Sequence, residues 1–121
     1  MSKLTIALDI MGGDHGPPVI LPAAVKAIQL HPDVHFTLCG DEDTIKAGIQ
    51  PLTNAERNRV TIVHCSQVVE MGEAPTSALR NKKDSSMRRV IELVESGEAN
   101  ACVSAGNTGA LLTLSFYLLK T

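Results

Sequence analysis

Short apolar runs alternate along the chain with stretches that carry apolar residues at helical spacing. The runs at 3–9, 34–39, 60–64 and 101–104 are rich in aliphatic and β-branched residues, as is typical of strands covered on both faces of a sheet. The stretches between them fit helices. This alternation predicts an α/β fold with a mostly parallel sheet.

The clearest helix is predicted over 85–96, where Gly97 ends it. Its apolar residues follow the i, i+3, i+4, i+7 pattern, and its charged residues fall on the other side: Met87, Val90, Ile91 and Val94 against Arg88, Arg89, Glu92 and Glu95. This pattern predicts a helix that packs one face on the sheet.

Further helical stretches are predicted with less regular patterns. One follows Pro18, with Pro22 in its first turn, and a second covers 44–49. Thr53 and Glu56 have capping-box spacing and predict one more turn. A last helix is predicted to run through Leu119 after a cap at either Asn107 or Thr108. The segment 65–81, which contains Gly72 and Pro75, is predicted to be irregular.

The composition excludes several classes of protein. A formal net charge of −2, one Tyr, two Phe and no Trp speak against nucleic-acid binding. The cysteines at 39, 65 and 102 have no CxxC spacing, so neither a zinc site nor a disulfide framework is predicted, and a reducing, cytoplasmic environment fits. The uncharged run 99–119 contains Gly106 and Gly109, so we interpret it as a strand, a loop and a buried helix rather than a membrane span.

Two loops are candidates for ligand binding, because ligands of parallel α/β sheets bind at the carboxyl ends of the strands. The first, 9–17 (DIMGGDHGP), contains Gly12, Gly13 and Asp14. The flanking acids Asp9 and Asp14 could orient backbone or side-chain donors, bind a metal through oxygen ligands, or cap the following helix, and capping is favoured for Asp14. The three glycines do not have GxGxxG spacing, so this loop is not a dinucleotide fingerprint.

The second loop, 104–109 (SAGNTG), joins an apolar strand to a helix start. Gly106 and Gly109 allow close backbone approach, and short polar side chains lie beside them: Ser104, Asn107 and Thr108. A phosphate or carboxylate site and a ligand-free capped turn are both compatible with this pattern.

The segment 80–89 (RNKKDSSMRR) holds five of the eleven basic residues of the chain. It could be a solvated face, a docking surface for an acidic partner, or an anion site at a helix start. The residues proposed for the anion site are Lys82, Lys83, Ser85 and Ser86. The histidines form no motif, and no covalent nucleophile is indicated.

Taken together, ALDIMGGDHGP, RNKKDSSM and ACVSAGNTGALL resemble the N-terminal part of the PlsX-type phosphate acyltransferases. The resemblance extends over the whole chain and implies that residues 1–121 are one α/β portion of a longer enzyme, without an internal boundary. It implies a three-layer α/β/α fold like that of isocitrate and isopropylmalate dehydrogenases. It also implies a cytoplasmic homodimer with loose peripheral association at the inner face of the membrane, and neither a cofactor nor a metal.

The implied reaction transfers a fatty acyl group from acyl carrier protein to inorganic phosphate for phospholipid synthesis. In this reading Asn107 and Thr108 donate to phosphate or to the oxyanion, and Asp14 orients the neighbouring wall. The implied binding residues are Gly12, Gly13, Lys82, Lys83, Ser85, Ser86, Ser104, Gly106 and Gly109. A phosphate acetyltransferase-like enzyme and a non-catalytic module that binds an anion or a partner are the alternatives.

Overall fold

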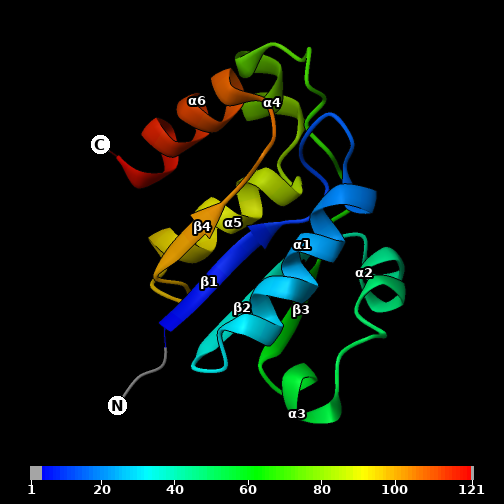
Figure 1. Cartoon of the computed structure of the whole chain (residues 1–121). Coiled ribbons are helices and arrows are strands. Elements are labelled where there is room, and N and C mark those ends of the chain that lie inside the picture. The colour runs from blue at the N-terminus through cyan, green and yellow to red at the C-terminus, as the bar shows by residue number, and fades with distance from the viewer. Residues whose placement is uncertain (1–3, 121) are drawn as a thin grey trace.

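The computed structural model describes residues 4–120. Within them, four strands form one sheet in the order β3-β2-β1-β4, and every neighbouring pair is parallel (Figure 1). The strands are β1 (Leu4–Asp9), β2 (Val34–Gly40), β3 (Val60–His64) and β4 (Ala101–Val103). The predicted parallel α/β fold is therefore confirmed. Lys3, which the prediction placed in the first strand, lies outside the described residues.

The two faces of the sheet pack against different sets of helices. Phe36 and Leu38 point into a core shared with α1 (Pro17–Leu30) and α2 (Glu42–Gly48). Their neighbour Cys39 points the other way, into a core beneath α5 (Ser86–Glu95), because successive strand residues face opposite sides. The sheet thus lies between two helical layers, which confirms the three-layer α/β/α architecture. The likeness to the dehydrogenases stays a prediction.

The helices of the first layer begin at recognisable caps. Asp41 accepts a hydrogen bond from the Thr44 amide (3.0 Å), so α2 begins two residues before the predicted start at Thr44. The predicted capping box is confirmed at the start of α3 (Asn54–Arg57), where Thr53 and Glu56 bond each other's backbone amides.

The second layer contains a helix that the sequence did not predict. α4 (Pro75–Asn81) lies inside the segment that was expected to be irregular, so that prediction is wrong. Its seven residues bury only Ala78, which leaves no apolar stripe to detect. The helix is stabilised by packing against α6 (Thr108–Leu119), whose N-cap is Asn107.

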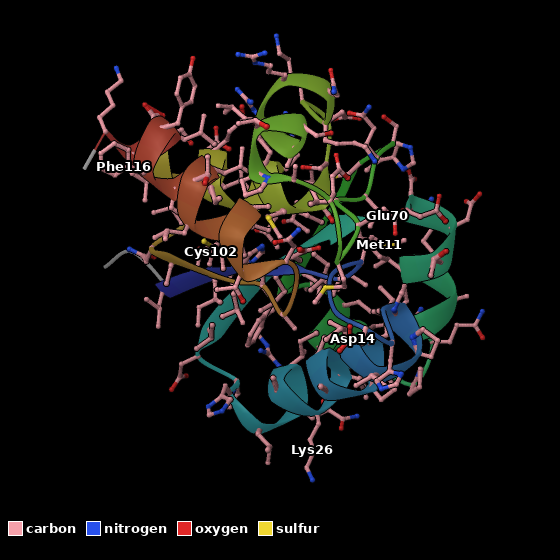
Figure 2. All side chains as sticks on the ribbon, turned by 90° about the horizontal axis from the view of Figure 1, so that it is seen from above. Met11, Asp14, Lys26, Glu70, Cys102 and Phe116 are labelled. Atoms are coloured by element: carbon pink, nitrogen blue, oxygen red, sulfur yellow. The ribbon has the colours of Figure 1, made fainter. Side chains whose placement is uncertain are left out.

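α6 packs on α4 and α5 and lies outside them, away from the centre of the sheet (Figure 1). Ala110 and Leu114 are buried on its inner side. Its outer side exposes Leu112 and Phe116, and Figure 2 shows Phe116 pointing away from the molecule. The predicted buried helix is therefore only half covered in this chain.

All four strands run in the same direction, so their carboxyl ends meet at one edge of the sheet. The loops that follow β1 and β4 lie there, beside the start of α5. This edge is where the two candidate loops of the sequence come together.

Candidate functional site

The carboxylate of Asp9, the last residue of β1, lies at the centre of this edge and is 2% exposed. Its Oδ1 accepts hydrogen bonds from the amides of Met11 and Gly12 (3.1 Å each) and from the Ser86 hydroxyl (2.5 Å). Its Oδ2 accepts one from the Ser104 hydroxyl (2.7 Å). One side chain therefore ties the first loop, the second loop and the start of α5 together.

Gly12 permits this close approach, and Gly106 packs closely against α5. A Cβ on Gly12 would lie 2.6 Å from Asp9 Oδ2 and 3.1 Å from the Gly106 amide nitrogen. A Cβ on Gly106 would lie 2.6 Å from the methyl carbon of Met87. The predicted glycine positions are thus explained by contacts within the protein, where the two loops touch each other.

The serines at the start of α5 form hydrogen bonds with other groups of the protein. Ser86 donates to Asp9, and Ser85 is the N-cap that accepts from the Arg88 amide (3.1 Å); both serines are buried. The carboxylate of Asp9 therefore occupies the place where an anion was expected beside these hydroxyls. A phosphate at that place would meet a buried negative charge.

Asn107 connects three segments of the chain. Its Oδ1 accepts from the Ala110 amide (3.1 Å), which caps α6, and its Nδ2 donates to the carbonyl oxygens of Glu70 (3.1 Å) and Glu73 (2.7 Å). The side chain is 8% exposed. These bonds place Asn107 as a tether between α6 and the segment that precedes α4.

That segment, 65–74, is held in place by residues of the predicted basic cluster. The Lys82 ammonium donates to the Val68 carbonyl oxygen (2.8 Å) and lies 3.4 Å from a carboxylate oxygen of Glu73. Asp84 accepts from the amide (2.9 Å) and the hydroxyl (2.6 Å) of Ser66. Sequence reasoning missed this role of Asp84. For Asp9 it named the orientation of donors as one of several roles and could not identify Ser86 and Ser104 as the donors, because these contacts are distant along the chain.

The outer side of the two loops is open. Thr108 and Gly109 are exposed at the start of α6, and the side chain of Thr108 makes no hydrogen bond within residues 4–120. Gly13 lies against Ala105 of the second loop. Asp14, in the loop after β1, is exposed as well (Figure 2). Asp14 does not cap α1, whose N-cap is Gly16, so the capping interpretation is wrong.

Lys83 is separated from the two loops. It lines a different hollow of about 300 Å³, together with Leu79, Arg80, Arg88 and Tyr117. The structure therefore brings together most of the predicted site residues and leaves this lysine outside them. In the basic cluster, Lys82 anchors the segment 65–74, whereas Arg80, Lys83 and Arg88 line an open hollow, called the cationic hollow below.

The chain is similar to proteins of a known family. The family model described as fatty acid synthesis protein matches residues 4–121. The chain belongs to this family. It is 52% identical to phosphate acyltransferases of Halorhodospira halophila and Legionella pneumophila strain Paris, over 99% and 100% of its length, and 50% identical to that of Methylococcus capsulatus over 97%. The chain spans about 35% of the length of the first two relatives.

Two of the three cysteines are poor nucleophiles, whereas the hydrogen bond with Cys39 lowers the pKa of the Cys65 thiol. A hydrogen bond with Cys65, together with burial, raises the pKa of the Cys39 thiol. Burial and the nearby Asp9 carboxylate raise the pKa of the Cys102 thiol. Both thiols are therefore protonated at neutral pH. In residues 4–120, no three His, Cys, Asp or Glu side chains cluster as metal ligands, and no helix is long and apolar enough to cross a bilayer.

Asp9→Asn is expected to lower the free energy of unfolding by about 1–3 kcal/mol. The donors now bond two carboxylate oxygens, and an amide side chain offers only one acceptor oxygen. Urea denaturation measures the change, and amide spectra should show the largest shifts at Gly12 and Gly106. Asp33→Asn is the control, since Asp33 is exposed and makes no hydrogen bond within residues 4–120. Equal losses in the two variants would contradict the central role of Asp9.

Asp84→Asn is expected to lower the free energy of unfolding by an amount that depends on pH. Hydrogen bonds from the Ser66 hydroxyl and amide lower the pKa of Asp84 from its ordinary value of 3.8. Because the folded pKa is the lower one, the stabilisation is complete above about pH 5 and is lost as the pH falls through 3.8 and then the folded pKa. The stability difference from the wild type should shrink over this range. A difference that does not change with pH would argue against the Ser66 bonds.

Proposed function

We propose that this chain is the N-terminal α/β portion of a longer phosphate acyltransferase, which transfers a fatty acyl group from acyl carrier protein to inorganic phosphate. The similarity to phosphate acyltransferases over the whole chain carries this proposal. The geometry supports it, because two glycine-containing loops converge beside an exposed helix start.

In this proposal, phosphate binds on the outer side of the second loop, at the start of α6. The amides of the first turn of a helix have no partner within the helix, and a negative charge is stabilised there. The amides of Thr108 and Gly109, with the Thr108 hydroxyl, are three donors without a partner in the described residues. The buried Asp9 carboxylate excludes phosphate from the inner side of the same loop.

The proposed reaction needs no nucleophile from the protein. A phosphate oxygen attacks the thioester carbonyl carbon, the new C–O bond forms, and the C–S bond breaks as the thiolate of the carrier leaves and takes up a proton. The protein has to hold two substrates together and to donate hydrogen bonds to the developing oxyanion. Thr108 is the first candidate for such a donor. Asn107 positions the start of α6, and the exposed Asp14 orients groups at the rim.

The cationic hollow is the proposed docking surface for acyl carrier protein, an acidic partner. Arg80 and Lys83 are exposed there and have no ion-pair partner in the described residues, whereas Arg88 is paired with Glu92 at 3.3 Å. Positive charge on this surface accelerates encounter with a negatively charged partner. A cytoplasmic homodimer with peripheral membrane association belongs to the same proposal.

A phosphate titration of this chain, monitored by amide NMR, tests whether phosphate binds at the start of α6. Chloride at matched ionic strength is the control. We expect saturable shifts at Gly13, Thr108 and Gly109. Thr108→Ala should weaken binding about three- to tenfold, because one hydrogen bond is lost. Thr113→Ala, on the same helix, should not change the affinity. Shifts that chloride reproduces, or that centre elsewhere, would contradict a phosphate site at α6.

The double charge reversal Arg80→Glu and Lys83→Glu tests carrier docking in the longer enzyme. We expect a higher KM for acyl carrier protein with kcat unchanged, and a weaker dependence of the rate on salt. Lys26→Glu is the matched control, because Figure 2 shows Lys26 pointing outward from α1 in the other helical layer. An unchanged KM in the double variant would remove the hollow from the docking surface.

A further inference from the structure

Two buried thiols lie side by side at the carboxyl ends of β2 and β3. Cys39 pairs with Val63 in the register of the sheet, so Cys65, two residues further along, faces the same side. The Cys65 amide donates to the Gly40 carbonyl oxygen (2.8 Å), which extends the pairing past the end of β3. Both side chains belong to the core beneath α5, and a hydrogen bond joins the two thiols. The proposed acyl transfer uses neither of them.

The two thiols differ in how readily they lose a proton. The hydrogen bond with Cys39 lowers the pKa of Cys65 from its ordinary value of 9.0, and the positive charge of Arg89 acts in the same direction. Burial and the carboxylates of Asp84 and Asp9 oppose this shift. The same hydrogen bond, together with burial, raises the pKa of Cys39. Cys65 is therefore the thiol that forms a thiolate, and Cys39 is the thiol that donates to it.

Arg89, on α5, carries a positive charge that is only loosely paired. Its Nε is buried and has no hydrogen-bond partner within residues 4–120. One terminal nitrogen of the same guanidinium lies 3.8 Å from a Glu92 carboxylate oxygen. A cation with this little compensation stabilises a thiolate in its neighbourhood. The surroundings of the pair thus favour a negative charge on Cys65.

Cys65 is buried but lies close to the surface. Its exposed fraction is 4%, and its neighbours along the chain, His64 and Ser66, are both exposed. A small uncharged oxidant such as hydrogen peroxide needs only a brief local opening of the chain to reach this sulfur. Cys39 is completely buried, so it is reached after Cys65.

We propose that Cys39 and Cys65 form a peroxide-sensitive dithiol, in which Cys65 is the nucleophile and Cys39 is the resolving thiol. The Cys65 thiolate attacks one peroxide oxygen, an S–O bond forms, the O–O bond breaks, and the leaving hydroxide takes up a proton to become water. The Cys39 sulfur then loses its proton and attacks the Cys65 sulfur. The S–S bond forms, the S–O bond breaks, and a second water leaves. Two thiols are oxidised to one disulfide, and one peroxide is reduced to two waters.

The disulfide changes the position of the segment 65–74. Diagonal neighbours on adjacent strands have Cα atoms about 7–8 Å apart, and a disulfide requires about 4.4–6.8 Å. Because Cys65 follows the last residue of β3, the bond draws the start of the segment toward β2. The carbonyl oxygens of Glu70 and Glu73 in this segment accept from Asn107, the N-cap of α6. Oxidation of the pair is therefore expected to alter the contacts at the start of α6.

Peroxide treatment of this chain, followed by mass spectrometry of its peptides, tests the proposal. We expect a cross-linked peptide pair that contains Cys39 and Cys65, full reversal by dithiothreitol, and a free thiol at Cys102. Cys102→Ala is the matched control, in which the disulfide should form at the wild-type rate. A sulfinic acid at Cys65 without a disulfide, equally fast oxidation of Cys102, or a disulfide between two chains would overturn the proposal.

Cys39→Ala and Cys65→Ala separate the two roles. Without Cys39, peroxide should give a sulfenic acid at Cys65 that dimedone traps, and no disulfide. Without Cys65, Cys39 should stay unmodified over the time in which the wild type reacts. If a variant does not fold, wild-type protein quenched early with dimedone gives the same assignment, because the label should appear on Cys65. A label that appears first on Cys39 would contradict the roles.

The pH dependence of the reaction tests the part played by Arg89. The rate of oxidation in the wild type should reach half its maximum below pH 9.0, because the thiolate is the reacting form. Arg89→Gln should move this midpoint to higher pH, because it removes a positive charge that stabilises the thiolate. Arg80→Gln is the control, since Arg80 is exposed in the cationic hollow. A wild-type midpoint at or above 9.0, or equal shifts in the two variants, would overturn the proposed activation of Cys65.

Amide NMR of the oxidised chain measures the displacement of the segment. We expect large shifts at Ser66 and a shift of the side-chain amide of Asn107, both reversed by dithiothreitol. The amide of Lys26, on α1 in the other helical layer, should not shift. A disulfide that leaves the Asn107 side chain unshifted would contradict the link between the dithiol and the start of α6.

Discussion

The hydrogen bonds of one buried carboxylate hold the functional edge of this protein together. Burying a charge is costly unless donors replace the water that it loses. Asp9 receives two amides and two hydroxyls, and these donors come from three segments of the chain. The requirement to satisfy this carboxylate therefore sets the positions of both loops and of the start of α5. The close approach in turn favours glycine at 12, where a Cβ would lie 2.6 Å from Asp9 Oδ2.

A second set of polar contacts shapes the rim of the same edge. Lys82, Asp84 and Asn107 bond the backbone or side chains of the segment before α4. These residues resemble ligand-binding groups in the sequence because they are polar and close to glycines and a helix start. In the structure they serve as anchors, and the donors left without a partner are those at the start of α6.

The proposed function follows from this division of roles. The inner side of the second loop is negatively charged and filled, while the outer side offers amides and a hydroxyl to an anion. The cationic hollow lies apart from both, so a large acidic carrier and a small anion would engage different surfaces.

The sequence by itself determined the parallel α/β fold, the capping box at Thr53 and the position of α5, and it narrowed the cap of α6 to Asn107 or Thr108, because apolar periodicity and caps are local properties. It also placed both candidate loops at strand ends. Only the tertiary structure decided that Ser86 and Ser104 bond Asp9, that Lys82 anchors a loop, and that α4 is a helix. Those outcomes depend on partners more than ten residues away, and a pattern of neighbouring residues cannot indicate which distant group satisfies a donor or an acceptor.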